Sequence, residues 1–300
     1  MNALGHYQNG NYHTWIYPDG TKIRFTKEDR FKPDFAENMD IKICDRCDMG
    51  CPYCHEGSTP DGKLGDILNE KFIDTLHPYQ EVALGGGNVL EHPSLVPFLK
   101  KLRDHKVIAN ITLNQKHFLD NLSFVESLVE QKLVYGVGVS LSSVTPALIE
   151  AVKAIPNVVI HVIVGVVRRE EIEGLAGHGL KILFLGYKDL RRGHDFLWDE
   201  LFYVYLCKKY LKEEIPKIIR SKEYFDVVSF DNLAIEQLEV KNFLSKEEWE
   251  QFYAGDDGSH TFYIDMVERK FAKSSTASFD RRYDLLDNVD EMFRRIRDEH

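Results

Sequence analysis

Short apolar runs alternate with amphipathic stretches through the middle of the chain. The run at 158–164 is almost continuously apolar, which is typical of a strand in a parallel sheet covered on both faces. Six strands of this kind are predicted, at 40–44, 81–86, 107–113, 135–142, 157–167 and 180–187. Helical periodicity separates them at about 66–77, 94–104, 121–132, 145–154 and 169–177.

This alternation predicts the α/β class and a partial (β/α)6 TIM-like barrel, two units short of a complete one. We assign residues 36–196 to this core. Residues 1–35 are predicted to contain an N-terminal β-hairpin, because Pro18-Asp19-Gly20 separates two alternating runs.

Beyond the core the alternation is lost, and residues 197–300 are predicted to form a C-terminal α+β extension. Its expected elements are helices at 198–219, 245–253 and 288–298, a strand at 227–230, and a hairpin with arms at 261–266 and 270–275.

Composition and charge restrict the classes of function. The 300 residues are 43% hydrophobic and 12% aromatic, enough for a sizeable core. A net charge of −10 argues against bulk nucleic-acid binding. No apolar run approaches the ~20 residues that cross a bilayer, and the polar start lacks a signal peptide. We therefore expect a cytoplasmic protein with no membrane partner.

Four of the five cysteines lie within residues 44–54, and this clustering is the strongest chemical signal. Cys47, Cys51 and Cys54 form a CxxxCxxC motif. In a reducing compartment such a cluster indicates metal binding rather than disulfides. Three thiolates can hold three corners of a cubane iron–sulfur cluster, which leaves one iron open to a small molecule.

Two alternatives use a fourth cysteine, Cys44. The pairs Cys44/Cys47 and Cys51/Cys54 could form a zinc site, although only three residues separate them. A four-cysteine electron-transfer cluster is the other alternative. The rival to an enzyme is therefore a non-catalytic, cysteine-rich metal-binding module. We favour a structural role for Cys44 in a buried strand.

The CxxxCxxC motif, with Tyr53 directly before Cys54, resembles that of the radical S-adenosylmethionine (SAM) superfamily. The resemblance implies a [4Fe-4S] cluster held by the three cysteines, with SAM on the open iron. It also implies an enzyme that cleaves SAM to a 5′-deoxyadenosyl radical and takes hydrogen from a substrate. The pattern is similar to uncharacterised phage and bacterial members without an auxiliary cluster.

Further residues match the superfamily's SAM-binding regions, and the resemblance implies that they contact SAM. Gly85, Gly86 and Gly87 follow the second strand, where backbone must approach the ligand closely. Asn88 stands where the family usually has an acidic residue, and Glu91 is expected to be a solvated loop residue. The other candidates are Tyr53 in the cysteine motif and six residues on or at the ends of later strands: Asn114, Ser140, Ser142, Ile163, Gly165 and Gly186. Ser140 and Ser142 are expected on one strand face.

The substrate is less constrained than the cofactors. The hairpin at 261–275 resembles one that opens auxiliary-cluster domains of peptide-modifying relatives, with Ser274 and Ser275 where a cysteine normally follows. We therefore expect a peptide or protein side chain; a small metabolite or nucleotide is the alternative. The resemblance also implies a one-electron donor such as flavodoxin or ferredoxin. Residues 191–194 are predicted to be a solvated basic turn, and His161 a hydrogen-bonded core residue.

Overall fold

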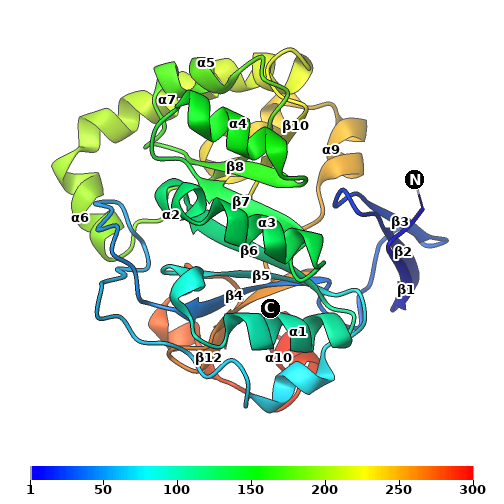
Figure 1. Cartoon of the computed structure of the whole chain (residues 1–300). Helices are drawn as coiled ribbons and strands as arrows, with labels where there is room; N and C mark the ends of the chain where they lie inside the picture. The colour runs from blue at the N-terminus through cyan, green and yellow to red at the C-terminus, as the bar shows by residue number, and fades with distance from the viewer. Residues whose placement is uncertain (1, 300) are drawn as a thin grey trace.

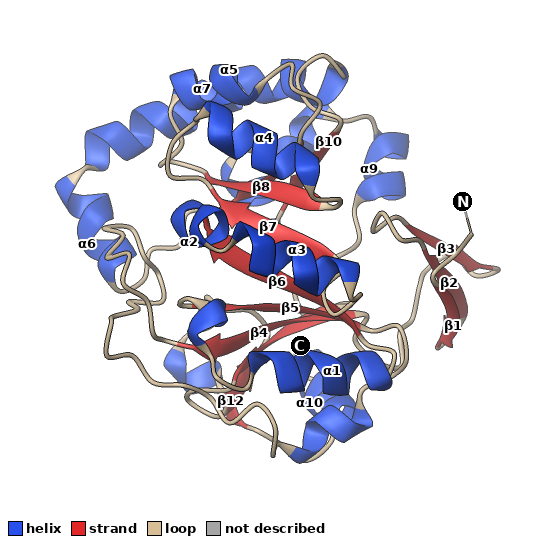
Figure 2. Ribbon diagram, in the orientation of Figure 1, coloured by secondary structure: helices blue, strands red, loops and turns tan. Residues whose placement is uncertain are grey.

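Six parallel strands form the centre of the molecule, as predicted (Figures 1 and 2). The computed structural model describes residues 2–299. Each strand pairs in parallel with its neighbour in sequence. The strands are β4 (Asn38–Cys44), β5 (Glu81–Gly86), β6 (Ile108–Asn114), β7 (Gly136–Ser140), β8 (Val158–Ile163) and β9 (Lys181–Leu185).

Helices cover the outer face of this sheet (Figure 2). They are α1 (Leu95–Asp104), α2 (Gln115–Asp120), α3 (Leu122–Glu130), α4 (Pro146–Ala154) and α5 (Arg169–Leu175). Helix α4 begins where expected, because the Thr145 side chain accepts from Leu148 N and Pro146 occupies the first turn. Helix α2 was not predicted.

The helix predicted at 66–77 is wrong. Only a 3₁₀ turn, η1 (Lys71–Thr75), forms there. The Asp66 carboxylate accepts hydrogen bonds from the backbone N–H groups of Leu68 and Asn69. Such local bonds favour a turn over a helix, and they override the apolar periodicity of this stretch.

The predicted N-terminal hairpin is present as β2 (Tyr12–Ile16) and β3 (Lys22–Thr26), and β1 (Gly5–Asn9) adds a third, unpredicted strand. This small sheet lies beside the amino-terminal ends of the barrel strands (Figure 1). Its 18–20 turn is held there by a hydrogen bond from Asn157 Nδ2 to Pro18 O. The small sheet therefore closes one end of the barrel.

The chain beyond β9 supplies both edges of the large sheet. Strand β10 (Val227–Phe230) pairs in parallel with β9, and β11 (Thr261–Asp265) pairs in parallel with β4. The sheet order is β10-β9-β8-β7-β6-β5-β4-β11-β12-β13. The remaining elements are η2 (Val89–Glu91), α6 (Arg192–Asp199), α7 (Leu201–Arg220), α8 (Asn232–Gln237), η3 (Val240–Phe243), α9 (Lys246–Phe252), β12 (Lys270–Ala272), η4 (Phe279–Arg281), β13 (Tyr283–Asp284) and α10 (Val289–Arg297).

Alternate residues of each barrel strand face opposite sides. On β4, Met39, Ile41 and Ile43 are fully buried in the apolar core, whereas Asp40 and Lys42 line the interior of the barrel. The barrel interior, which we call the lumen, therefore carries polar groups even in strands that contribute heavily to the core. Within residues 2–299, no helix combines the length and apolar character needed to cross a bilayer.

Candidate active site

A cavity of about 830 Å³ occupies the lumen and extends from the 18–20 turn to the cysteine loop at the carboxyl ends of the strands. This is where folds of this kind assemble their active sites. Many residues predicted to bind the cluster or SAM line it: Cys47, Cys51, Tyr53, Cys54, Gly85, Gly86, Gly87, Asn114, Ser140 and Ile163.

The three motif cysteines lie in the loop that follows β4. All three are free, partly exposed thiols. A tight turn, closed by a hydrogen bond of 3.2 Å from Cys54 N to Cys51 O, brings the last two close together, and all three line the same cavity. Burial raises the pKa of Cys47 and Cys51, and the neighbouring motif thiols raise it further. A cationic metal centre would offset that penalty, and the sulfur donors fit an iron–sulfur cluster.

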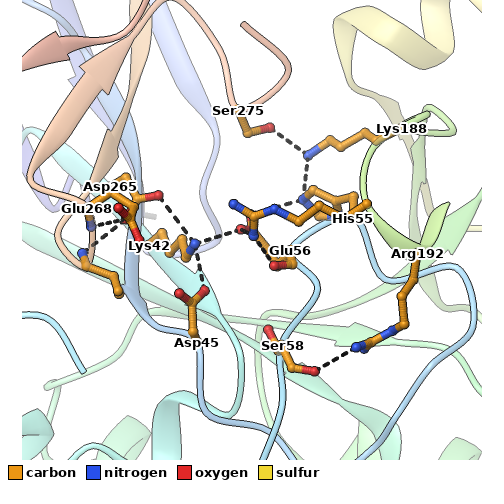
Figure 3. Close-up of polar contacts among 12 residues, drawn as sticks. Lys42, Asp45, His55, Glu56, Ser58, Lys188, Arg192, Asp265, Glu268 and Ser275 are labelled. Carbon is orange, nitrogen blue, oxygen red and sulfur yellow. Dashed lines mark hydrogen bonds and ion pairs between the residues drawn. The ribbon is translucent and has the colours of Figure 1, made fainter. Parts of the chain in front are cut away.

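Arg192 fastens this loop from the far side of the barrel. Its Nε donates to Cys51 O at 3.0 Å. Its Nη1 donates to Ser58 O, also at 3.0 Å (Figure 3). The prediction of a solvated basic turn at 191–194 is therefore wrong: the segment opens α6, and Arg192 is only partly exposed. The loop carbonyls that this guanidinium satisfies lie too far away in sequence to be anticipated.

A buried ammonium ties the loop to the C-terminal strands. Lys42 Nζ lies 2.6 Å from Asp45, 3.1 Å from Glu56 and 3.3 Å from Asp265 (Figure 3). Burial alone would lower the pKa of Lys42, but these carboxylates, Glu56 first, raise it overall. Lys42 therefore stays charged and joins β4, the cysteine loop and β11.

The three predicted glycines have different surroundings. A side chain at Gly85 would meet open space, so this position leaves room for a ligand. Gly86 has φ +112°, and a Cβ there would lie 2.2 Å from Cys44 O. At Gly87 a Cβ would lie 2.1 Å from Arg46 O. Gly86 and Gly87 thus allow the start of the cysteine loop to pack against the end of β5.

Asn88 is buried and does not line the cavity. Its Oδ1 accepts from Leu90 N, and its Nδ2 donates to Glu91 Oε1 at 3.1 Å. Both polar atoms of the Asn88 side chain are thus engaged within the same short segment. Glu91 is exposed, as expected. Contact of Asn88 with SAM stays a prediction.

Asn114 and Ser142 meet at the end of the barrel strands. Asn114 Oδ1 caps α2, and its Nδ2 donates to Ser142 Oγ at 3.2 Å. Only Ser140 belongs to β7. The expectation that Ser142 shares its strand face is wrong, because β7 ends at Ser140 and Gln115 Oε1 accepts from Ser142 N in the following loop. Ser142 lines a neighbouring cavity of about 290 Å³.

Tyr53 and Ile163 line both cavities. The Tyr53 ring meets Phe196 of α6 edge-on at 5.8 Å, and burial raises its pKa to about 12. Two predicted glycines do not line either cavity. A Cβ at Gly165 would meet Val204 of α7, and one at Gly186 would meet Leu233 of α8. Because these glycines have no side chain, α7 and α8 can pack closely against the barrel.

His161 is not the hydrogen-bonded core residue that the sequence suggested. It lines the large cavity, and its ring lies over Gly138, where a Cβ would come within 2.2 Å of the imidazole. Among the described residues, Nδ1 has no hydrogen-bond partner. Burial lowers the pKa of His161 to about 4, so the imidazole is neutral near pH 7.

Sequence reasoning missed several polar residues around the cavity. Lys188 Nζ donates to Ser275 Oγ at 2.9 Å and lies 3.3 Å from His55 Nε2 (Figure 3). His117 Nε2 lies 2.6 Å from Asp48 Oδ1, beside Cys47. Nothing in the local pattern marks these residues, since their partners come from distant segments. Cys44 is fully buried in the core, and burial raises its pKa to about 12.

The fold is that of known proteins, although the sequence is distant from them. No family model and no curated protein matches the chain. Among solved structures, the chain is similar to Streptococcus suis SuiB bound to S-adenosylmethionine (TM-score 0.52, 14% identity) and to SuiB bound to the precursor peptide SuiA (TM-score 0.51, 13% identity). Each match covers 81% of this chain and about 60% of SuiB. The predicted partial barrel is therefore confirmed as the fold, which this chain shares with SuiB.

Proposed function

We propose that this chain is a radical SAM enzyme in which Cys47, Cys51 and Cys54 hold a [4Fe-4S] cluster and SAM binds beside it. The observation that carries the proposal is that three free thiols of one loop line the same barrel cavity. The similarity of the fold to SuiB, which has been solved bound to S-adenosylmethionine, supports it.

When bound, the cluster supplies SAM with one electron from a donor such as flavodoxin or ferredoxin, giving methionine and a 5′-deoxyadenosyl radical that takes hydrogen from a substrate C–H bond. The chain's own residues position these groups. Gly85 leaves the space beside β5 free, and Ile163 and Tyr53 provide apolar walls. The surrounding barrel limits the access of water to the reaction.

The proposed substrate is a peptide or protein side chain. SuiB has been solved with the precursor peptide SuiA, and this supports the proposal for a chain with the same fold. A side chain on a flexible backbone can enter a lumen that the rest of the peptide does not fit. Transfer of deuterium from a labelled peptide to 5′-deoxyadenosine would test this part.

The first experiment is anaerobic reconstitution followed by incubation with SAM and dithionite. We expect about four irons per chain, and 5′-deoxyadenosine in the chromatogram. Alanine at Cys47, Cys51 or Cys54 should abolish both. The matched control is Cys207→Ala, because this cysteine is buried on α7, away from the cavity. Stoichiometric zinc without iron, or SAM cleavage that survives loss of a motif cysteine, would contradict the proposal.

A further inference from the structure

The lumen has one wall of small residues and one acidic wall. Strands β5 and β7 place Ala83, Gly85, Gly136 and Gly138 on the lumen. Asp40 from β4 and Asp231 from the end of β10 line the same cavity. These two strands lie toward the two edges of the barrel sheet, so the carboxylates flank its open side.

Asp40 is a carboxylate without a partner. No hydrogen bond or ion pair to its side chain is formed among residues 2–299, and the residue is exposed rather than packed against protein atoms. Its accessible surface faces the cavity. Desolvation within the barrel raises the pKa of Asp40, which the more distant Lys188 partly offsets. Because the cavity gives access to this carboxylate, a cation or hydrogen-bond donor that enters the cavity can pair with it.

Two further carboxylates lie close enough to Asp40 to affect its pKa. Asp231 and Asp257 both oppose its ionisation. One oxygen of Asp231 accepts from the backbone N–H groups of Gly186 and Ala234, and burial raises its pKa as well. Acidic side chains therefore gather on this side of the lumen, and the two backbone bonds to Asp231 involve one of its two oxygens.

The chain's own cations are engaged elsewhere. Lys42 is surrounded by three carboxylates of its own. Lys188 donates to Ser275 and lies beside His55. His161, across the lumen, is held neutral by its lowered pKa and offers an unpaired nitrogen but no positive charge. Among the described residues, none of these groups is an ion-pair partner of Asp40.

We propose that the substrate group that enters the lumen is an organic cation, a primary ammonium or a guanidinium, and that Asp40 receives it with the support of Asp231. This inference rests on the proposed function, since it names the substrate class of the same cavity. A metal ion fits less well. Within residues 2–299, neither carboxylate belongs to a set of three ligand atoms lying within 4.8 Å of one another. A slender charged side chain also leaves space for SAM in a cavity of about 830 Å³.

The test measures binding to the anaerobically reconstituted protein in the presence of SAM. The probes are pentapeptides of four glycines with a central lysine, arginine, glutamine or norleucine, acetylated and amidated at their ends so that only the central side chain differs in charge, and titrated calorimetrically. We expect the lysine or arginine peptide to bind at least about tenfold more tightly than the glutamine peptide, because a charge-assisted pair replaces a neutral one. In Asp40→Asn this ratio should fall to about one.

Matched variants separate charge from folding. Asp40→Glu keeps the charge and should keep a preference for the cationic peptide. Asp104→Asn, exposed at the end of α1, should leave the ratio unchanged. Should Asp40→Asn not fold, the wild-type protein still decides: n-butylamine should displace the lysine peptide, whereas butyrate and butanol should not.

The free amine also distinguishes two sources of the same chemistry. Binding of n-butylamine as tight as that of the lysine peptide supports a cationic site for a small amine, and tighter peptide binding supports a peptide substrate. Equal binding of all four peptides, including binding of none, overturns the inference, as does a ratio that survives in Asp40→Asn. SAM cleavage measured in the absence of peptide tests the proposed function separately.

Discussion

Arg192 donates from Nε to the carbonyl oxygen of Cys51 at 3.0 Å, and so connects the first turn of α6 to the middle of the cysteine motif. Its second bond, to Ser58 O, holds the end of the same loop. One side chain thereby fixes the loop on both sides of Cys54. The position of the three thiols thus depends on a residue outside the motif.

We expect Arg192→Gln to reduce cluster retention. A hydrogen bond from a charged donor contributes about 1.5–3 kcal/mol, and the shorter amide cannot reach both carbonyls. Iron per chain after reconstitution and gel filtration should fall several-fold, with a lower melting temperature. Arg169→Gln removes a surface arginine paired with Glu173 and serves as the control. Iron content equal to that of the control would show that the loop holds its shape without Arg192.

Replacing Lys42 should destabilise the folded chain strongly. In Lys42→Met, Asp45, Glu56 and Asp265 would lose their shared counter-ion, and Asp265 is fully buried. Breaking a buried ion pair from one side costs about 3–5 kcal/mol. Urea denaturation of the apoprotein measures the change. The control Lys71→Met breaks an exposed pair with Asp287 and should leave the midpoint unchanged. A similar midpoint in both variants would refute the structural importance of the buried network.

The sequence was most informative where one residue pattern has one physical meaning. Continuous apolar runs such as 158–164 located the parallel strands, and the cysteine spacing located the metal loop. The alternation Asp40-Ile41-Lys42-Ile43 carried a further signal that was not used. Charged residues at every second position of an apolar strand indicate that this face of the strand borders a cavity instead of packing in the apolar core.

The rest depended on contacts between distant segments. The ion pair of Lys42 with Asp265 exists because β11 pairs with β4, and no local pattern sets that sheet order. The same holds for Lys188 and Ser275. Gly165 and Gly186 show a different limit of the sequence. Both were predicted to contact SAM because they lie near the expected site, whereas the absence of a side chain at these positions makes room for α7 and α8.

The glycines beside β5 should separate ligand binding from packing. Gly85→Ala adds a methyl group to open space and should leave the melting temperature unchanged while weakening SAM binding. Gly87→Ala places that methyl 2.1 Å from Arg46 O, so the melting temperature should fall. Thermal unfolding of the apoprotein and SAM titration of the reconstituted protein measure the two effects. Unchanged SAM affinity in Gly85→Ala would remove this position from the SAM site.

The buried carboxylate of Glu37 should make stability depend on pH. Its oxygens accept hydrogen bonds from Tyr12 Oη and from Arg24 Nη2, both at 2.7 Å. Because Tyr12 and Arg24 belong to the N-terminal sheet, these bonds connect that sheet to the start of β4. Burial opposes ionisation, but Arg24 and Lys22 overcome it and lower the pKa of Glu37 from 4.5 to about 2. Because the folded pKa is lower, the stabilisation is complete above about pH 4.5 and is lost as the pH falls toward 2.

That shift corresponds to about 3 kcal/mol, so Glu37→Gln should be less stable than wild type by about this amount at pH 7. The difference should shrink as the pH falls from 4.5 toward 2, because protonation of Glu37 removes the same charge in the wild type. Urea denaturation of both proteins across this range provides the measurement. Glu28→Gln, in an exposed pair with Lys32, should follow the wild type throughout. A constant difference between wild type and Glu37→Gln down to pH 2 would mean that packing, not the carboxylate charge, holds the N-terminal sheet to the barrel.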